Sequence, residues 1–266
     1  MNNFSACDYV ILIKIIYNYR TKQIRWSMVA WNYLEVIGVI FYLSFIFERF
    51  LIPFYRQFGL VEIPLSGLVL SIFGTIMPSI IIFLCGFYCL LHAWMNAAAE
   101  LLRFGDRMFY KDWWNASSFD VYYRTWNVVV HDWLYTYIYK DMYEHVLKGS
   151  RVGSTIVVFT ISATVHEFIL SFAFGFFYPI MFLMFEGAGV FFMFVTKKEH
   201  KAVGNIIMWL SLCLGNGIMF SLYNIEYFAR QNCVVGNSVL DFFIPVSWSC
   251  HGITYNPDWR MQTPWM

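Results

Sequence analysis

A histidine and a glutamate stand side by side in a segment that is otherwise apolar. His166 and Glu167 lie near the middle of the run 152–178, which is long enough to cross a lipid bilayer. An ionisable side chain at that depth is expected to face a cavity, a partner or a pathway, and imidazole transfers protons readily near neutral pH. The pair therefore predicts acid–base chemistry inside a membrane. A histidine that only hydrogen-bonds between helices is the alternative.

The two side chains are not expected to share a ligand. Glu167 lies about 100° around the helix from His166, so we expect it to contact a neighbouring helix. A zinc motif is excluded at this position, because residue 170 is Leu where a second His would be required. His131 is a weaker candidate for the same chemistry. It follows Asn127 by four residues, which would place both on one helical face.

The composition places the whole chain in the membrane class. Its 266 residues are 59% hydrophobic, 21% aromatic and only 13% charged, far from the usage of soluble domains. The abundance of Trp and Tyr is typical of a protein with two membrane–water interfaces. A net charge of +1 provides no basic field for nucleic acid, which we exclude as a partner. We therefore expect an all-α, polytopic helical membrane protein.

Five apolar segments are candidates for membrane helices, and they divide the chain into three parts. The segments are 28–47, 65–91, 152–178, 180–195 and 205–223. We expect residues 1–27 to form an interfacial segment, 28–224 the transmembrane core and 225–266 a lumenal tail. Within the core, 92–150 is too aromatic and charged to be a simple span.

Basic residues collect on one predicted side of the membrane. Clusters at 20–25 and 197–201 fall on the same side when the crossings are counted. That side also carries Arg103, Arg107, Lys111 and Arg124. The positive-inside rule makes it cytosolic, so the tail lies in the oxidising lumen. Spacing alone leaves open whether Cys233 and Cys250 form a disulfide there or remain free thiols.

The segment 92–150 holds two ordered strings of aromatic, charged and amide residues. The first reads FYKDWWN at 109–115, and the second reads RTWNVVVHDW at 124–133. Interleaved Arg, Lys, Trp and Tyr could cradle phosphates and stack on a purine ring. An interfacial aromatic belt with snorkelling cations is the alternative.

These strings resemble signatures of the membrane-bound O-acyltransferase family, in its sterol O-acyltransferase branch. The string at 109–115 is similar to the FYxDWWN signature that this branch shares with diacylglycerol acyltransferases. The string at 124–133, with ATVHE at 163–167, ARQNC at 229–233 and SWSC at 247–250, resembles the sterol enzymes in particular. The resemblance runs from about residue 25 to residue 250 and corresponds to the C-terminal half of the family's plan.

The resemblance implies a reaction and roles for individual residues. A long-chain fatty acyl group would pass from acyl-CoA to a sterol hydroxyl, giving steryl ester and CoA. His166 matches the family's catalytic base, and Asn127 matches its second signature residue. We expect His131 and Glu167 to support these two residues without contacting the reactants themselves. A diacylglycerol or other lipid-alcohol acyltransferase remains an alternative, as does an inactive, truncated partner subunit.

The resemblance also implies ligands, partners and location. Acyl-CoA is expected as a co-substrate, with no separate cofactor and no metal. Residues expected to bind it are Phe109, Tyr110, Asp112, Trp113, Trp114, Asn115 and Arg124. Cys233 and Cys250 match cysteines that form a lumenal disulfide in the family. Sterol and membrane lipids are the other expected partners of a multi-pass endoplasmic reticulum protein, which we expect to be a homo-oligomer.

Overall fold

The described residues form a helical structure with four long apolar helices. The computed structural model describes residues 21–60, 64–196, 201–233 and 239–250 and contains no β-strand in these ranges. The helices long and apolar enough to cross a membrane are Trp26–Tyr55, Leu65–Leu101, Arg151–Phe174 and Lys201–Asn232, and Ile180–Val195 is a shorter apolar helix. The prediction of an all-α, polytopic membrane protein is confirmed.

Several helices extend beyond the apolar segments from which they were predicted. The first contains α2 (Trp26–Ile46), η1 (Phe47–Leu51) and α3 (Ile52–Tyr55), and the second contains α4 (Leu65–Phe87), η2 (Tyr88–Trp94) and α5 (Met95–Leu101). The segment 92–150 therefore begins inside a helix. Likewise α11 (Lys201–Asn232) continues past the predicted start of the tail at 225. Hydropathy marks the part of a helix that suits lipid, whereas good helix formers continue the helix beyond it.

The helix that carries His166 is shorter at its end than predicted. α8 (Arg151–Phe174) stops at Gly175, which adopts a left-handed conformation with φ of 76°. Glycine tolerates this conformation because it lacks a Cβ atom. The chain then turns back into α9 (Ile180–Phe182), η6 (Leu183–Gly189) and α10 (Val190–Val195). η6 has wider, π-helical turns.

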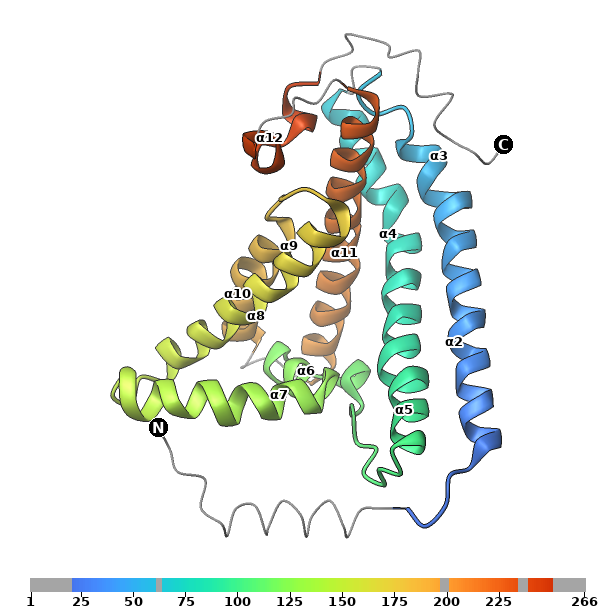
Figure 1. Cartoon of the computed structure of the whole chain (residues 1–266). Coiled ribbons are helices and arrows are strands. Elements are labelled where there is room, and N and C mark those ends of the chain that lie inside the picture. Colours follow the sequence, from blue (N-terminus) through green and yellow to red (C-terminus); the bar gives the residue numbers. More distant parts are fainter. Residues whose placement is uncertain (1–20, 61–63, 197–200, 234–238, 251–266) are drawn as a thin grey trace.

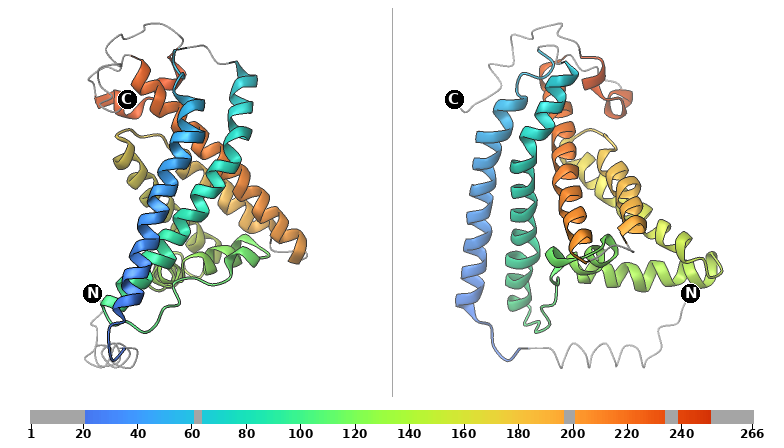
Figure 2. Two further views of the ribbon diagram at one scale, coloured as in Figure 1. Left: turned by 90° about the vertical axis from the view of Figure 1, so that its right-hand side faces the viewer. Right: turned by 180° about the vertical axis from the view of Figure 1, so that it is seen from behind.

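The long helices stand together, and a further helix crosses one end of them. α2, α4–α5 and α11 run side by side, and the inclined pair α8 and α9–α10 leans against them (Figures 1 and 2). At the lower end of Figure 1 lie η3 (Trp113–Asn115), α6 (Phe119–Trp126) and the crosswise helix that begins with α7 (Val128–Leu134) and continues through η4 (Tyr135–Tyr139) and η5 (Met142–Val146). The crosswise helix and α8 lie close together at one end and diverge toward the other.

Small and polar side chains join the long helices. A Cβ atom on Gly217 of α11 would lie 2.7 Å from Ile76 Cγ1 of α4, so glycine permits the close approach of these two helices. Tyr55 is fully buried, and its hydroxyl hydrogen-bonds Thr75 Oγ1 at 2.5 Å and Ser221 Oγ at 2.7 Å. These bonds tie α3 to α4 and α11.

The two ends of the bundle differ in charge and chemistry. Arg25 and Arg107 both bind the buried carboxylate of Glu100 at the end that carries α6 and α7, which groups these arginines as the charge pattern predicted. Lys197, Lys198 and the segments 1–20 and 251–266 lie outside the described residues. At the opposite end Cys233 and Cys250 form a disulfide, with Cα atoms 6.2 Å apart.

Hydrogen bonds to an ion pair within α11 fasten the tail to this helix. Glu226 is fully buried, and its carboxylate accepts hydrogen bonds from Arg230 Nε at 2.6 Å, Val246 N at 2.8 Å and Ser247 N at 3.0 Å. Arg230 also donates hydrogen bonds to two backbone carbonyl oxygens, that of Asp241 within α12 (Val239–Phe243) and that of Ile244 directly after it. This network holds η8 (Val246–Trp248), and hence Cys250, against the end of α11.

Candidate active site

A large cavity lies between the crosswise helix and the inclined pair. Its volume is about 1630 Å³, and its walls come from α6, α7, α8, η6, α10 and α11. Ligand pockets in proteins are typically roughly 300–1,000 Å³, so this cavity could hold two reactants. Of the predicted site residues, His166, Asn127, His131 and Arg124 line it. Glu167 and the string 109–115 do not.

One nitrogen of His166 is free to act as a base. Nδ1 lies 2.7 Å from the carbonyl oxygen of Ser162, one turn earlier on α8. A carbonyl oxygen only accepts hydrogen bonds, so in the neutral ring Nδ1 carries the proton. Nε2 then bears a lone pair and has no protein partner among the described residues. The side chain is exposed to the cavity rather than packed between helices.

Aromatic rings pack against the imidazole of His166. Phe185 of η6 stacks on His166 with ring centroids 5.2 Å apart and planes at 20°. Tyr123 of α6 and Phe159 of α8 each pack against Phe185, both at 5.6 Å. Burial raises the pKa of the Tyr123 hydroxyl further above neutral pH, so this hydroxyl is a neutral group in the cavity wall. Gly189 makes room for this hydroxyl, since a Cβ there would lie 2.5 Å from it.

Asn127 occupies the junction of α6 and α7. It has extended backbone angles, and its Oδ1 accepts a hydrogen bond from Val130 N at 3.2 Å, which caps α7. The Nδ2 donors have no partner among the described residues and are available to a ligand. His131 begins the next turn, as the spacing predicted, and its Nδ1 lies 3.0 Å from Asp132 Oδ1. Arg124 forms an ion pair with Asp120.

The string 109–115 supports the Asn127 junction through its backbone. Lys111 N donates to Thr125 O at 2.8 Å, and Phe109 O accepts from Val128 N at 2.9 Å. These two bonds lie on either side of Asn127 and fix the turn that presents its amide. The carbonyl of Trp114 accepts from Asn205 Nδ2 at 2.8 Å and from the indole of Trp209 at 3.0 Å. The string is therefore also fastened to the start of α11.

The side chains of this string are divided between core and surface. Phe109 and Trp113 are 5% and 2% exposed, and Trp113 is the centre of an aromatic cluster. Its partners are Phe83, Phe87, Trp114, Tyr122, Trp126 and Trp209. Asp112, Trp114 and Asn115 are exposed. Binding of acyl-CoA by this string remains a prediction, and its visible contacts are structural.

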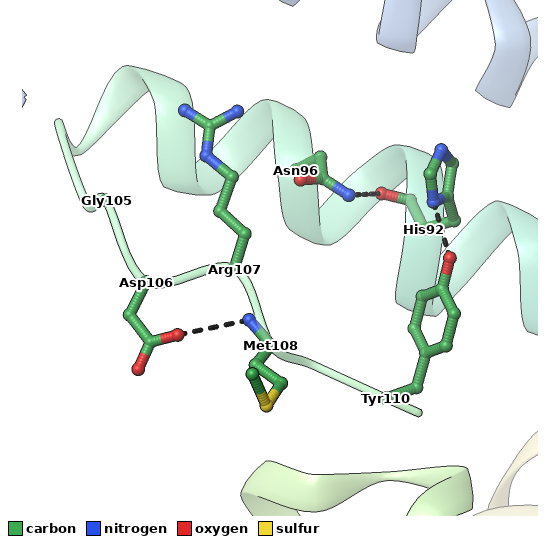
Figure 3. A pocket seen from close by; sticks show the side chains of 7 residues that line it. All are labelled: His92, Asn96, Gly105, Asp106, Arg107, Met108 and Tyr110. Carbon is green, nitrogen blue, oxygen red and sulfur yellow. Dashed lines mark hydrogen bonds between the residues drawn. The ribbon is translucent and has the colours of Figure 1, made fainter. Parts of the chain in front are cut away.

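Tyr110 belongs to a separate, smaller pocket. This pocket, of about 570 Å³, lies between the end of the Leu65–Leu101 helix and the loop at 105–110 (Figure 3). Its side chains bond one another: Tyr110 OH lies 2.8 Å from His92 Nδ1, and Asp106 accepts from Met108 N. Arg107 reaches toward the helix and binds Glu100. These groups bond one another, in contrast to Nε2 of His166 and Nδ2 of Asn127 in the large cavity.

A row of parallel rings in the large cavity was not predicted. His131, Tyr135, Tyr139 and Tyr143 stack in sequence, with centroids 6.3, 5.4 and 6.0 Å apart and planes within 16°. All four line the cavity, as do Lys140 and Arg151. The tyrosines recur every four residues, a spacing that places side chains on one helical face. This spacing is the feature of the sequence from which the row of rings could have been predicted.

Comparison with known proteins identifies the family. Residues 15–225 match the model of the membrane-bound O-acyltransferase family. Sterol O-acyltransferase 1 of Mus musculus is 44% identical over 233 residues, which cover 87% of this chain and 43% of that protein. Sterol O-acyltransferase 2 of Homo sapiens is 43% identical over 234 residues, which cover 87% of this chain and 45% of that protein. The chain thus spans less than half the length of these curated relatives. Because the family model covers most of its residues, this chain belongs to the membrane-bound O-acyltransferase family.

Proposed function

We propose that this chain carries the reaction chamber of a sterol O-acyltransferase, with His166 as the general base. The observation that carries the proposal is the contact of His166 Nδ1 with the carbonyl oxygen of Ser162, which assigns the proton to Nδ1 and leaves Nε2 as a proton acceptor in the large cavity. The sterol enzymes named above are among the relatives that match the chain. The long-chain fatty acyl-CoA is the acyl donor and needs no further cofactor.

In this mechanism the sterol hydroxyl attacks the thioester directly. Nε2 of His166 takes the hydroxyl proton as the new C–O bond forms. The free Nδ2 donors of Asn127 orient a reactant or stabilise the negative charge on the carbonyl oxygen. The C–S bond then breaks, and the imidazolium returns the proton to the CoA thiolate. Atoms and charge balance, and the products are steryl ester and CoA.

The stacked tyrosines suit the nucleotide end of CoA. A flat aromatic surface favours a purine ring, and Lys140 and Arg151 offer cations to phosphates at the same wall. Arg151 begins α8 and His166 lies fifteen residues on, roughly 22 Å along the helix axis. The pantetheine arm of CoA would bridge this distance. Sterol and membrane lipids would approach from the bilayer.

The two ends of the bundle support a location in the endoplasmic reticulum membrane. The disulfide between Cys233 and Cys250 lies at one end, and the arginines that bind Glu100 lie at the other. An oxidising lumen beyond the first end and a cytosolic supply of acyl-CoA at the second agree with this polarity. We further propose that the chain works as a homo-oligomer, as the family resemblance implies.

The test is ester formation by the full chain in lipid nanodiscs. Labelled oleoyl-CoA is supplied with either a sterol or diacylglycerol, and the labelled ester is identified. We expect steryl ester from the wild type and from His145→Ala, whose side chain is exposed and outside the cavity. We expect no ester from His166→Ala. Turnover by a folded His166→Ala variant would refute the role of His166 as the general base.

Two other outcomes would replace the proposal. Labelled triacylglycerol in place of steryl ester would make the chain a diacylglycerol acyltransferase. The second outcome is stable binding to a longer acyltransferase with no turnover by the chain itself, which would make the chain a partner subunit. It is tested because the chain spans less than half the length of these curated relatives.

A further inference from the structure

Glu167 joins three helices through hydrogen bonds. It is 3% exposed, and its Oε2 accepts from Phe182 N at 3.0 Å. The Tyr223 hydroxyl of α11 donates to the same carboxylate at 3.0 Å. The oxygen of Tyr223 in turn accepts from Met181 N at 3.2 Å. Helices α8, α9 and α11 therefore meet at one buried, hydrogen-bonded point.

This point caps the helix Ile180–Val195. The first N–H groups of a helix have no acceptor within the helix, and a carboxylate near them is favoured by the helix dipole. Here the acceptors for Met181 and Phe182 come from α11 and α8 rather than from a preceding residue. The bonds therefore fix the position and rotation of this helix against its two neighbours.

The same helix carries the ring that supports the imidazole. Phe185 lies one turn after Met181 and stacks on His166 at 5.2 Å. Because a helix moves as a stiff unit over one turn, a displacement at its capped end would move Phe185 as well. His166 would then keep only the bond from its Nδ1 to Ser162 O. The direction of Nε2 thus depends on the hydrogen bonds that hold the start of α9.

We propose that Glu167 and Tyr223 are positioning residues for His166, acting through the start of α9 and through Phe185. This inference rests on the base role proposed for His166. Neither Glu167 nor Tyr223 lines the cavity, so neither touches the reactants directly. Their effect is on the orientation of the imidazole.

The decisive variant removes one hydroxyl. Tyr223→Phe deletes the donor to Glu167 and the acceptor for Met181 N while retaining the ring that packs on Phe174 and Tyr178. A misplaced base slows the chemical step but does not weaken binding of the substrates in the ground state. We therefore expect kcat for ester formation to fall about tenfold, with KM for acyl-CoA unchanged. Tyr227→Phe is the matched control, since Tyr227 lies one turn along α11 and is 39% exposed.

A second readout does not depend on turnover. The nitrogen NMR spectrum of histidine-labelled chain reports the tautomer of each imidazole, and the His166 signals are assigned by their loss in His166→Asn. We expect an Nδ1-protonated ring in the wild type and in Tyr227→Phe. In Tyr223→Phe the Nδ1 proton remains bonded to Ser162 O, and we expect the ring-proton signals of His166 to shift because the ring current of the stacked Phe185 is lost. If the chain alone shows no turnover, this spectrum decides.

Paired substitutions of Glu167 test the role of its oxygen atoms. Glu167→Gln retains an acceptor for Phe182 N, so we expect it to restore most of the kcat that Glu167→Ala loses. The proposal is overturned if Glu167→Gln is as impaired as Glu167→Ala, or if Tyr223→Phe matches Tyr227→Phe in both rate and spectrum. Failure of the base role itself looks different, because His166→Ala would then retain turnover.

Discussion

Substitutions of Trp113 separate a packing role for the string 109–115 from a role in binding acyl-CoA. Trp113 is 2% exposed, and its ring lies 4.8 Å from Trp126 and 5.1 Å from Phe87. Replacing a buried Trp with Ala typically costs about 3–5 kcal/mol through lost burial and the remaining cavity. The edge-to-face contacts place this site at the upper end of that range. We therefore expect Trp113→Ala to lower the free energy of unfolding by about 5 kcal/mol.

Trp113→Phe is expected to be much milder. The indole N–H of Trp113 is buried and has no hydrogen-bond partner in the part of the chain that the structure describes, and an unsatisfied buried donor costs about 1–3 kcal/mol. Phenylalanine removes that donor and keeps an aromatic ring, so the two effects offset one another in part. We expect a loss of less than about 2 kcal/mol, given the usual cost of smaller changes to a packed core.

Stability and substrate binding are then measured on the same samples. Unfolding is followed by circular dichroism while denaturing detergent is added to the chain in mild detergent, and KM for acyl-CoA is measured in nanodiscs. Trp31→Phe is the matched control, since this tryptophan of α2 is 64% exposed and lies outside both the string 109–115 and the cavity lining. A packing role predicts an unchanged KM in Trp113→Phe. A raised KM with unchanged stability would refute the reasoning.

Three further outcomes follow from buried groups. Glu226→Ala removes the acceptor of three hydrogen bonds and leaves the partly buried Arg230 without its carboxylate, so detergent unfolding should show that the free energy of unfolding falls by about 3–5 kcal/mol. Gly59→Val should raise maleimide labelling of thiols, because a Cβ there lies 2.7 Å from both sulfurs of the Cys233–Cys250 disulfide; unchanged labelling would contradict this. Gly189→Val should reduce esterification without unfolding the chain, since its side chain enters the cavity wall; full activity would argue against the site.

The helices and the candidate base were accessible from local sequence. Burial in lipid favours long apolar segments, so hydropathy found the spans, although it missed their polar ends beyond 47, 91 and 223. His166 was notable because an ionisable group in such a segment demands an explanation. Asn127 and His131 were linked by their spacing of four residues, which holds in the structure because Asn127 caps the helix that contains His131.

Only the tertiary structure assigned partners to these residues. The bond between Tyr223 and Glu167 spans 56 positions, and that between Asn205 and Trp114 spans 91. Helical periodicity states which face of a helix a residue occupies, but not which helix packs there or at what angle. Those choices come from close contacts such as Gly217 against α4 and from the need to satisfy buried polar groups. For this reason the sequence by itself determined the class of protein and its candidate base, while the packing of distant helices decided what holds that base in place.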